Sequence, residues 1–359
     1  MEKTLYIDAS HPNETRVVLK NGDNIEDYEY EGLKNNLIKN NIYLGKVSRV
    51  EPSLQAAFID FGRDKHGFLS FNDIQSDYYQ IPQSDLAKIK EEEEKDREEL
   101  QKESEKEEEK NITDGNLDIN DPVNIKPETD INITTSNSQL NDEIIVGKDL
   151  SEEILVTDFK KPGLKFRSKR YKIQEVIKPN QVILIQVLKD ERGQKGAALS
   201  TFISIAGKYI VLMPNTPKGG GISRKIFNPG ERKKIRTILN DISIPKEMGL
   251  IIRTAGSNKT KNDIDHDLQT LIKTWNEIKE TALNSIAPSL IHQESDIIKR
   301  TLRDLYDEDT NSIVIEGNDG YKKAQSFMKM MMPSHVKKIK KYREKVPLFF
   351  KENIEEKLN

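Results

Sequence analysis

The sequence predicts an α+β fold that contains a small β-barrel and one long inserted loop. Short alternating segments with turn signals between them, in residues 41–71 and 170–203, indicate about five strands. Apolar residues at steps of three and four after residue 205 indicate amphipathic helices. A polar, acidic segment separates the two groups of strands. With 359 residues, the chain is long enough for two or three domains.

Composition limits the setting of the protein. The chain has no cysteine, which excludes disulfides, thiol nucleophiles and cysteine zinc sites and predicts a reducing, cytoplasmic compartment. The chain contains no run of about 18 apolar residues, so no membrane-spanning helix is predicted. The opening "MEKTLYIDAS" carries acidic residues and no hydrophobic signal core, so a secreted protein is not expected.

Charge is distributed unevenly along the chain. Residues 85–148 hold 20 acidic and 9 basic residues, whereas the rest of the chain holds 40 acidic and 48 basic residues. A basic body is typical of RNA-binding proteins. The acidic segment is rich in Asn, Asp and Thr, so we expect residues 83–164 to form a disordered loop. Two interpretations of this loop remain open, an inert spacer or a regulatory element that competes with RNA.

The strands before and after the insert predict the barrel. "KTLYIDAS" and "ETRVVLKNG" form the first strands, with a hairpin turn at Asn21-Gly22. "NIYLGKVSRVEP" and "LQAAFIDFG" follow as a second pair, and "NQVILIQVLKDERGQKGAALSTFIS" supplies two more strands after the insert. Residues 41–71 and 170–203 thus supply about five short strands, which suit an OB-type barrel interrupted midway by the acidic segment.

The last third of the chain alternates helices and strands. Helices are predicted over 229–240 and 263–283, with a buried strand at 249–256 between them. Ser295 is predicted to cap the next helix. The remaining elements are the strand "SIVIEG", the helix "YKKAQSFMKMMM", the strand "VKKIKKY" and one more helix in "PLFFKENIEEKLN".

A first candidate binding face lies on the barrel. Phe58 and Phe68 flank the basic loop "GRDKHG", and Lys195 lies in "GQKGAALS". Aromatic side chains beside cations bind unpaired bases by stacking. The alternative is that the two rings fill the barrel core. Because Phe58 shares a strand face with Asp60, opposite Ile59, alternation along the strand favours exposure.

A second candidate is the strand end "RTAGSNK", where Arg253 and Thr254 precede a glycine turn. A guanidinium, a hydroxyl and backbone N–H groups at one turn bind anions, although Arg-Thr at a strand end is also ordinary loop chemistry. The five histidines show no metal-ligand spacing, and no carboxylate cluster or phosphate loop is visible. The residues by themselves therefore indicate binding and no catalytic or metal site.

Several long segments resemble the ribonuclease E/G family, on the ribonuclease E side. The resemblance covers essentially all of the chain except the acidic insert. The matching segments are "NIYLGKVSRVEPSLQAAFIDFGRDKHGFLSF", "ERGQKGAALSTFISIAGKYIVLMPN", "GGISRKI", "GLIIRTAG" and "PSLIHQESDIIKRTLRD".

The resemblance implies a division into subdomains. Residues 1–37 and 299–359 are expected to form an RNase H-like subdomain that carries no catalytic residues. An S1-type RNA-binding barrel spans 38–82 and 165–201, and a sensor for 5′-monophosphate ends of RNA spans 202–298. Phe58 and Phe68 then correspond to the barrel's RNA-contacting aromatics and Lys195 to their basic partner. Arg253 and Thr254 correspond to the pair that holds the terminal phosphate, with Gly207 and Val211 lining that pocket.

The family's catalytic residues have no counterpart in these residues. In the family, a DNase I-like subdomain with two magnesium-binding aspartates and an asparagine follows, one aspartate lying in a motif like "AIDINS". A Cys-Pro-x-Cys zinc link between protomers comes next. We therefore expect this chain to bind no cofactor and to be inactive alone.

Two hypotheses about function follow from the resemblance. In the first, the chain is the RNA-binding and end-sensing half of an endoribonuclease that acts on single-stranded AU-rich RNA in RNA processing and decay, with a second chain supplying catalysis. In the second, it is a free-standing RNA-binding module or a truncated remnant. The family is oligomeric and cytoplasmic, with partners that place it at the inner membrane.

Overall fold

The computed structural model describes most of the chain outside the acidic insert. No helix among these residues is long and apolar enough to cross a membrane. The described residues are 2–11, 13–32, 37–92, 95, 171–193, 195–216, 221–245, 247–294, 296–307 and 309–358.

The two ends of the chain share one five-stranded sheet. Its strands are β1 (Lys3–His11), β2 (Glu14–Asn21), β3 (Asn24–Gly32), β14 (Thr310–Glu316) and β15 (Ile339–Lys341), in the order β15-β14-β1-β2-β3. β2 runs antiparallel to β1 and β3, whereas β14 runs parallel to β1 and β15. β1 therefore finds a neighbour some 300 residues away in the sequence.

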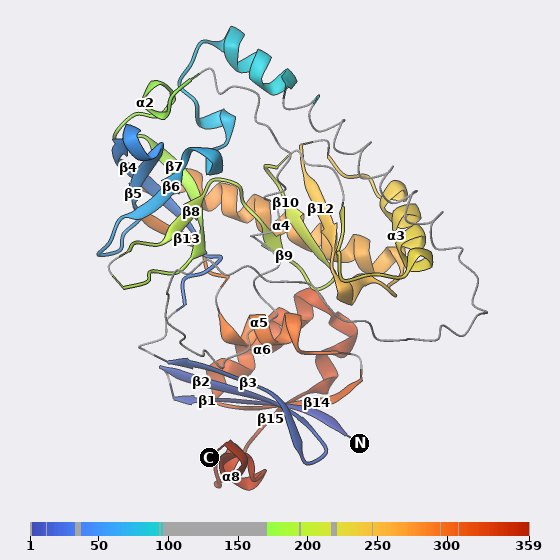
Figure 1. The fold of residues 1–359 in the computed structure, drawn as a ribbon. Coiled ribbons are helices and arrows are strands. Elements are labelled where there is room, and N and C mark those ends of the chain that lie inside the picture. The colour runs from blue at the N-terminus through green and yellow to red at the C-terminus, as the bar shows by residue number, and fades with distance from the viewer. Residues whose placement is uncertain are drawn as a thin grey trace, which may run out of the picture. The chain divides into compact units, whose positions relative to one another are not determined.

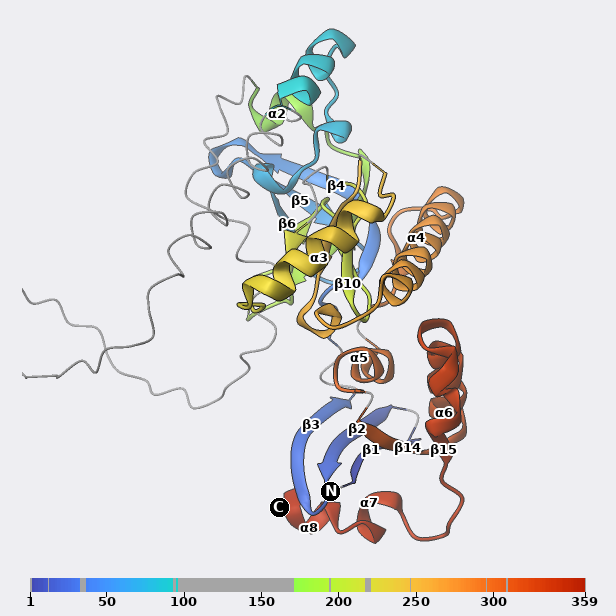
Figure 2. The same cartoon turned by 90° about the vertical axis from the view of Figure 1, so that its right-hand side faces the viewer.

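Helices cover both faces of this sheet (Figure 2). One face packs against α5 (Ile297–Asp304) and α6 (Asn318–Met331), and the other against α7 (Leu348–Lys351) and α8 (Ile354–Leu358). The two faces follow from strand alternation, because neighbouring residues on β2 enter different cores. Val17 joins the α5 and α6 side, and Val18 joins the α7 and α8 side.

A second sheet closes into a barrel of five strands. The strands are β4 (Ile42–Glu51), β5 (Ala56–Asp60), β6 (Gly67–Ser70), β7 (Val182–Lys189) and β8 (Ala198–Ser200). They pair in the order β4-β5-β6-β8-β7, and β7 pairs back onto β4, which leaves no gap in the ring. The predicted α+β class with a closed barrel of OB type is confirmed to this extent. A sixth strand, β13 (Ser289–His292), adds to β4 from outside the ring.

A third, four-stranded sheet has the order β11-β12-β10-β9. Figure 1 labels its strands β9, β10 and β12. The sheet consists of β9 (Ile205–Ala206), β10 (Ile210–Met213), β11 (Gly221–Ile222) and β12 (Gly249–Ile252). Two helices, α3 (Pro229–Asp241) and α4 (Lys261–Asn284), share its core. The apolar spacing of α4 explains this packing, since Ile264, Leu268, Leu271, Trp275 and Ile278 are all buried.

Shorter elements complete the described residues. α2 (Ile173–Val176) packs into the barrel core, and residues 83–92 are helical. Near the start of the helix formed by residues 83–92, Asp85 accepts a hydrogen bond of 2.6 Å from the Tyr171 hydroxyl. Except for residues 83–92 and 95, the segment predicted as a disordered loop lies outside the described residues. The 3₁₀ turns are Pro52–Leu54, Phe71–Asp73, Ser76–Tyr78, Thr254–Gly256 and Pro333–Lys338.

Local predictions differ from the structure at a few points. The helix expected over 229–240 begins at Pro229 as predicted. The N-cap of α5 is Asp296, whose carboxylate accepts from two backbone N–H groups. Ser295, the predicted cap, lies outside the described residues. The strand β3 and the strand β13, which adds to the barrel from outside the ring, were not predicted. The final predicted helix is divided into α7 and α8 because Asn353, at φ 55°, has a left-handed conformation that interrupts it.

Candidate nucleic-acid interface

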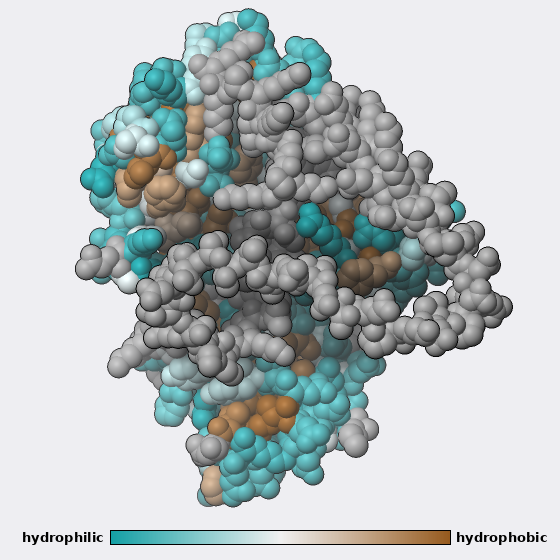
Figure 3. Space-filling model, in the orientation of Figure 1, coloured by the Kyte–Doolittle hydropathy of each residue, from teal (hydrophilic) through white to brown (hydrophobic). Residues whose placement is uncertain are grey.

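The strand alternation predicted for the barrel is confirmed. Ala57, Ile59 and Phe61 point into the barrel core, whereas Phe58 and Phe68 are half-buried on the outer side. The two rings are direct cross-strand partners on β5 and β6, with centroids 6.1 Å apart in an edge-to-face arrangement. Figure 3 shows apolar surface among hydrophilic residues over the barrel strands. The barrel thus carries an aromatic pair outside its core.

A cation extends this pair across the next strand. Arg49 on β4 is the register partner of Phe58, and its guanidinium carbon lies 4.4 Å from the centroid of the Phe58 ring. The three side chains form a row across β4, β5 and β6. A guanidinium stacked on an aromatic ring is a favourable cation–π contact and also supplies positive charge beside it. Arg49 was not among the residues predicted from the sequence.

The basic loop after β5 is tied to the turn that carries Lys195. Lys65 Nζ donates to the carbonyl of Gly193 at 2.6 Å, and the Arg63 guanidinium lies 3.6 Å from Glu191. A Cβ at Gly196 would lie 2.0 Å from the His66 carbonyl oxygen, so only glycine allows the two segments to approach this closely. Lys195 is exposed and directly precedes Gly196, whose backbone contacts the basic loop before Phe68.

The second predicted site lies where β12 ends. Arg253 Nη1 donates to the Gly207 carbonyl at 2.7 Å, and Nη2 donates to Asp304 Oδ1 at 2.7 Å. The structure thus brings Arg253 and Gly207 together, with exposed Thr254 as the next residue. Val211 is buried in β10, where it pairs with Ala206 and Ile251.

A buried carboxylate shapes the turn that begins at Gly207. Asp267 on α4 accepts hydrogen bonds from the backbone N–H groups of Lys208, Tyr209 and Ile210, the shortest at 2.8 Å. Burial raises the pKa of Asp267, although these three donors oppose the rise. A Cβ at Gly207 would lie 2.6 Å from the Asp267 carboxylate. Asp267 therefore fixes the conformation of the turn whose carbonyl holds Arg253.

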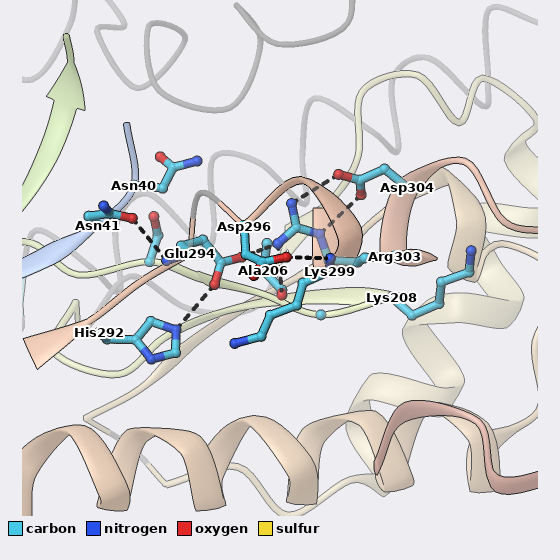
Figure 4. Close-up of polar contacts among 12 residues, drawn as sticks. Asn40, Asn41, Ala206, Lys208, His292, Glu294, Asp296, Lys299, Arg303 and Asp304 are labelled. Carbon is cyan, nitrogen blue, oxygen red and sulfur yellow. Dashed lines mark hydrogen bonds and ion pairs between the residues drawn. The ribbon is translucent and has the colours of Figure 1, made fainter. Parts of the chain in front are cut away.

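A line of alternating charges runs from Asp304 through Arg303 to Glu294 (Figure 4). Asp304 bridges Arg253 and Arg303, with Oδ2 accepting from Arg303 Nη2 at 2.9 Å. Arg303 also pairs with Glu294, which in turn contacts His292 Nε2 at 3.3 Å. Burial by itself raises the pKa of Asp304, but the two guanidinium groups bring it below its ordinary value. Asp304 is therefore charged at neutral pH.

Lys208 follows Gly207 and is buried. Its ammonium donates to the carbonyl of Tyr306 and lies 5.7 Å from the centroid of the Tyr306 ring. Burial lowers the pKa of Lys208 to about 8. The lysine therefore connects the turn after β9 to the segment that follows α5.

Comparison of the chain with known proteins shows the family to which it is similar. Residues 204–359 match the family model of the ribonuclease E/G family. The chain is 32% identical to ribonuclease E of Haemophilus influenzae over 356 residues and 31% identical to that of Escherichia coli over 357 residues. A relative from Buchnera aphidicola subsp. Baizongia pistaciae that carries the ribonuclease E name is 30% identical, with 99% of this chain and 67% of the relative covered.

The chain belongs to the ribonuclease E/G family. It spans 29% of the length of the Haemophilus relative and 26% of the Escherichia relative. Among the residues that the structure describes, no three Asp, Glu, His or Cys side chains gather to hold a metal ion. These described residues therefore do not fit the magnesium or zinc site that the family resemblance implies.

Sequence reasoning missed several residues around the predicted sites. Asp267 and Asp304 contact residues 51 to 58 positions away along the chain, which no local pattern reports. The acidic residue after a helical "RTLR" run in α5 was the only local signal for Asp304. Arg49 was visible as a cation one strand away from Phe58, but its register partner depends on the bulge between β4 and β5.

Proposed function

We propose that these residues form the RNA-binding and end-sensing part of a ribonuclease E-type endoribonuclease. The outer row of the barrel, with Lys195 beside it, would hold unpaired nucleotides of AU-rich RNA. The turn around Arg253 would hold a 5′-monophosphate. The observation that carries the proposal is the row Arg49-Phe58-Phe68, which combines two partly exposed rings and a cation outside the barrel core.

The subdomains follow from the same proposal. The five-stranded sheet of residues 1–37 and 299–359 would be the RNase H-like part, and its order β3-β2-β1-β14-β15 with only β2 antiparallel supports this assignment. The barrel would span 38–82 and 165–201, and the sensor 202–298. Separate cores in the three sheets support the division.

Stacking on the barrel is tested by removing both rings. If each ring stacks one base, replacing Phe58 and Phe68 by Ala should weaken binding of a single-stranded AU-rich oligonucleotide by about 2–6 kcal/mol. Fluorescence anisotropy at fixed salt measures the affinity, and circular dichroism verifies the fold. Phe350→Ala is a matched control, because Phe350 is 66% exposed on α7. A loss below about 0.5 kcal/mol in a folded double variant contradicts the stacking role.

End sensing is tested separately at Arg253. Arg253→Ala should abolish any preference for 5′-monophosphate over 5′-hydroxyl RNA, because it removes the guanidinium that would pair with the phosphate. Affinity for 5′-hydroxyl RNA should change little. A preference that survives in the folded variant contradicts the assignment of Arg253.

The alternative function is that of an RNA-binding module without catalysis, which shares the same binding predictions. A cleavage assay with magnesium and 5′-monophosphorylated RNA, run with and without a second chain that carries the catalytic subdomain, separates the two functions. Cleavage that appears when the second chain is added supports the divided enzyme, and binding without cleavage in both mixtures supports the module.

A further inference from the structure

A basic segment with an exposed aromatic residue lies outside both proposed sites. Residues 223–236 contain six cations and a single acidic residue, Glu231. Within this segment Phe227 is 85% exposed, the most exposed aromatic side chain among the described residues. Lys233 and Lys234 are exposed on α3, where they lie away from buried Ile235, and Lys225 is exposed in the preceding loop.

The loop that carries Phe227 is held in one conformation. Ile226 is buried in the core of the sheet, so the adjacent Phe227 points outward. Arg232 Nη1 donates to the carbonyls of Ser223 and Ile226, both at 3.2 Å, and thereby closes the loop from the helix side. The Asn228 side chain caps α3 through the N–H of Gly230. The exposure of Phe227 is therefore built into the fold.

This segment begins beside Arg253. β11 and β12 run parallel, with Ile222 paired to Ile252, and the N–H of Ser223 donates to the Ile252 carbonyl at 2.9 Å. Parallel strands end at the same edge of a sheet, so the Phe227 loop and the Arg253 turn leave the sheet together. A strand of RNA whose end lies at Arg253 would have its next nucleotides near this loop.

We propose that Phe227 and the lysines of α3 form a further contact for single-stranded RNA. A base stacks on Phe227, while Lys225, Lys233 and Lys234 contact the flanking phosphates. Exposed aromatics beside cations are the combination that binds unpaired nucleotides irrespective of sequence. An acidic protein partner would meet the cations, but it would have no need of a single rigid ring among them. The inference rests on the proposed RNA-binding function and adds a third contact to it.

The direct test places a reporter at the ring. Trp275 is the only tryptophan of the chain and is 8% exposed, so Phe227→Trp adds a fluorophore whose signal is distinguished by comparison with the unaltered protein. Titration with a single-stranded 10-nucleotide RNA should quench the added fluorescence, because a stacked base quenches indole emission. Quenching absent at saturating RNA overturns the proposal.

Affinity measurements supply the second arm. Phe227→Ala should weaken binding about 5- to 100-fold for 5′-phosphate and 5′-hydroxyl RNA alike. The double variant Lys233→Glu and Lys234→Glu should have a shallower slope of log K against the logarithm of the salt concentration. The slope should fall in magnitude by at least about one unit, because each phosphate contact to a single strand contributes about 0.7 to it. Phe350→Ala serves as the control, because its neighbouring cation Lys351 is already paired with Glu344.

The outcomes separate this contact from the proposed function. Equal loss of affinity with both RNA ends supports the contact even if Arg253→Ala leaves the end preference unchanged, which would contradict only the end-sensing proposal. An affinity of Phe227→Ala within twofold of the unaltered protein, with both RNAs, overturns the contact. If Phe227→Ala leaves RNA affinity unchanged and the lysines are found to bind an acidic protein, the segment would be assigned to a protein partner.

Discussion

Replacing Asp304 by Asn should strengthen binding of RNA that carries a 5′-monophosphate. Asp304 Oδ1 accepts from Arg253 Nη2 at 2.7 Å, so a phosphate that binds Arg253 competes with this carboxylate. The phosphate also comes to lie near its negative charge. Asparagine keeps the shape and one acceptor oxygen, so Arg253 and Arg303 stay near their positions while the competing charge disappears.

The size of the effect follows from the exposure of the pair. A hydrogen bond between charged groups contributes about 1.5–3 kcal/mol. The Arg253 and Asp304 side chains are 20% and 29% exposed, so water compensates part of the interaction. We therefore expect a gain of about 1–2 kcal/mol, which lowers the dissociation constant for 5′-monophosphate RNA about 5- to 30-fold. The affinity for 5′-hydroxyl RNA should stay within about twofold.

The assay is the ratio of affinities for two 10-nucleotide RNAs that differ only at the 5′ end. Asp307→Asn is a matched control, because it removes the same charge three residues further along, where the carboxylate contacts Lys3. An unchanged or lower ratio in folded Asp304→Asn refutes the competition between Asp304 and phosphate. If Asp307→Asn raises the ratio of affinities equally, the effect of Asp304→Asn is explained by overall charge.

Two further predictions concern the turn that holds Arg253. Gly207→Ala should destabilise the protein by about 1–3 kcal/mol, because the new Cβ meets the Asp267 carboxylate at 2.6 Å, and a midpoint of urea unfolding unchanged from that of the unaltered protein contradicts this packing. The low pKa of Lys208, about 8 against 10.5 in the unfolded chain, means that the unfolded state binds a proton in this interval that the folded state releases. The free energy of unfolding should therefore rise by about 2–3 kcal/mol between pH 7 and pH 10. Lys208→Met should lack this rise in urea unfolding at each pH, and equal pH dependence in both proteins contradicts the burial of the ammonium.

Local periodicity determined much of what the sequence could predict. The spacing of apolar residues in α4 and the alternation around Phe58 depend only on residues within a few positions, because helix and strand geometry repeat every 3.6 and 2 residues. The Asn21-Gly22 turn between β2 and β3 is local in the same way. The family resemblance added a prediction that local periodicity could not make, that Arg253 and Gly207 share one site. The structure brings these two residues into contact.

Contacts between distant segments were decided by the tertiary structure alone. The pairing of β1 with β14 and the addition of β13 to β4 join residues about 250 to 300 positions apart. Asp304 reaches Arg253 across 51 positions, and Asp267 reaches the turn after Gly207 across almost 60. Such pairings have no periodic signature, because many segments of similar hydrophobicity compete for each strand edge and each buried charge. The choice among them is made when the cores pack together and every buried polar group must find a partner.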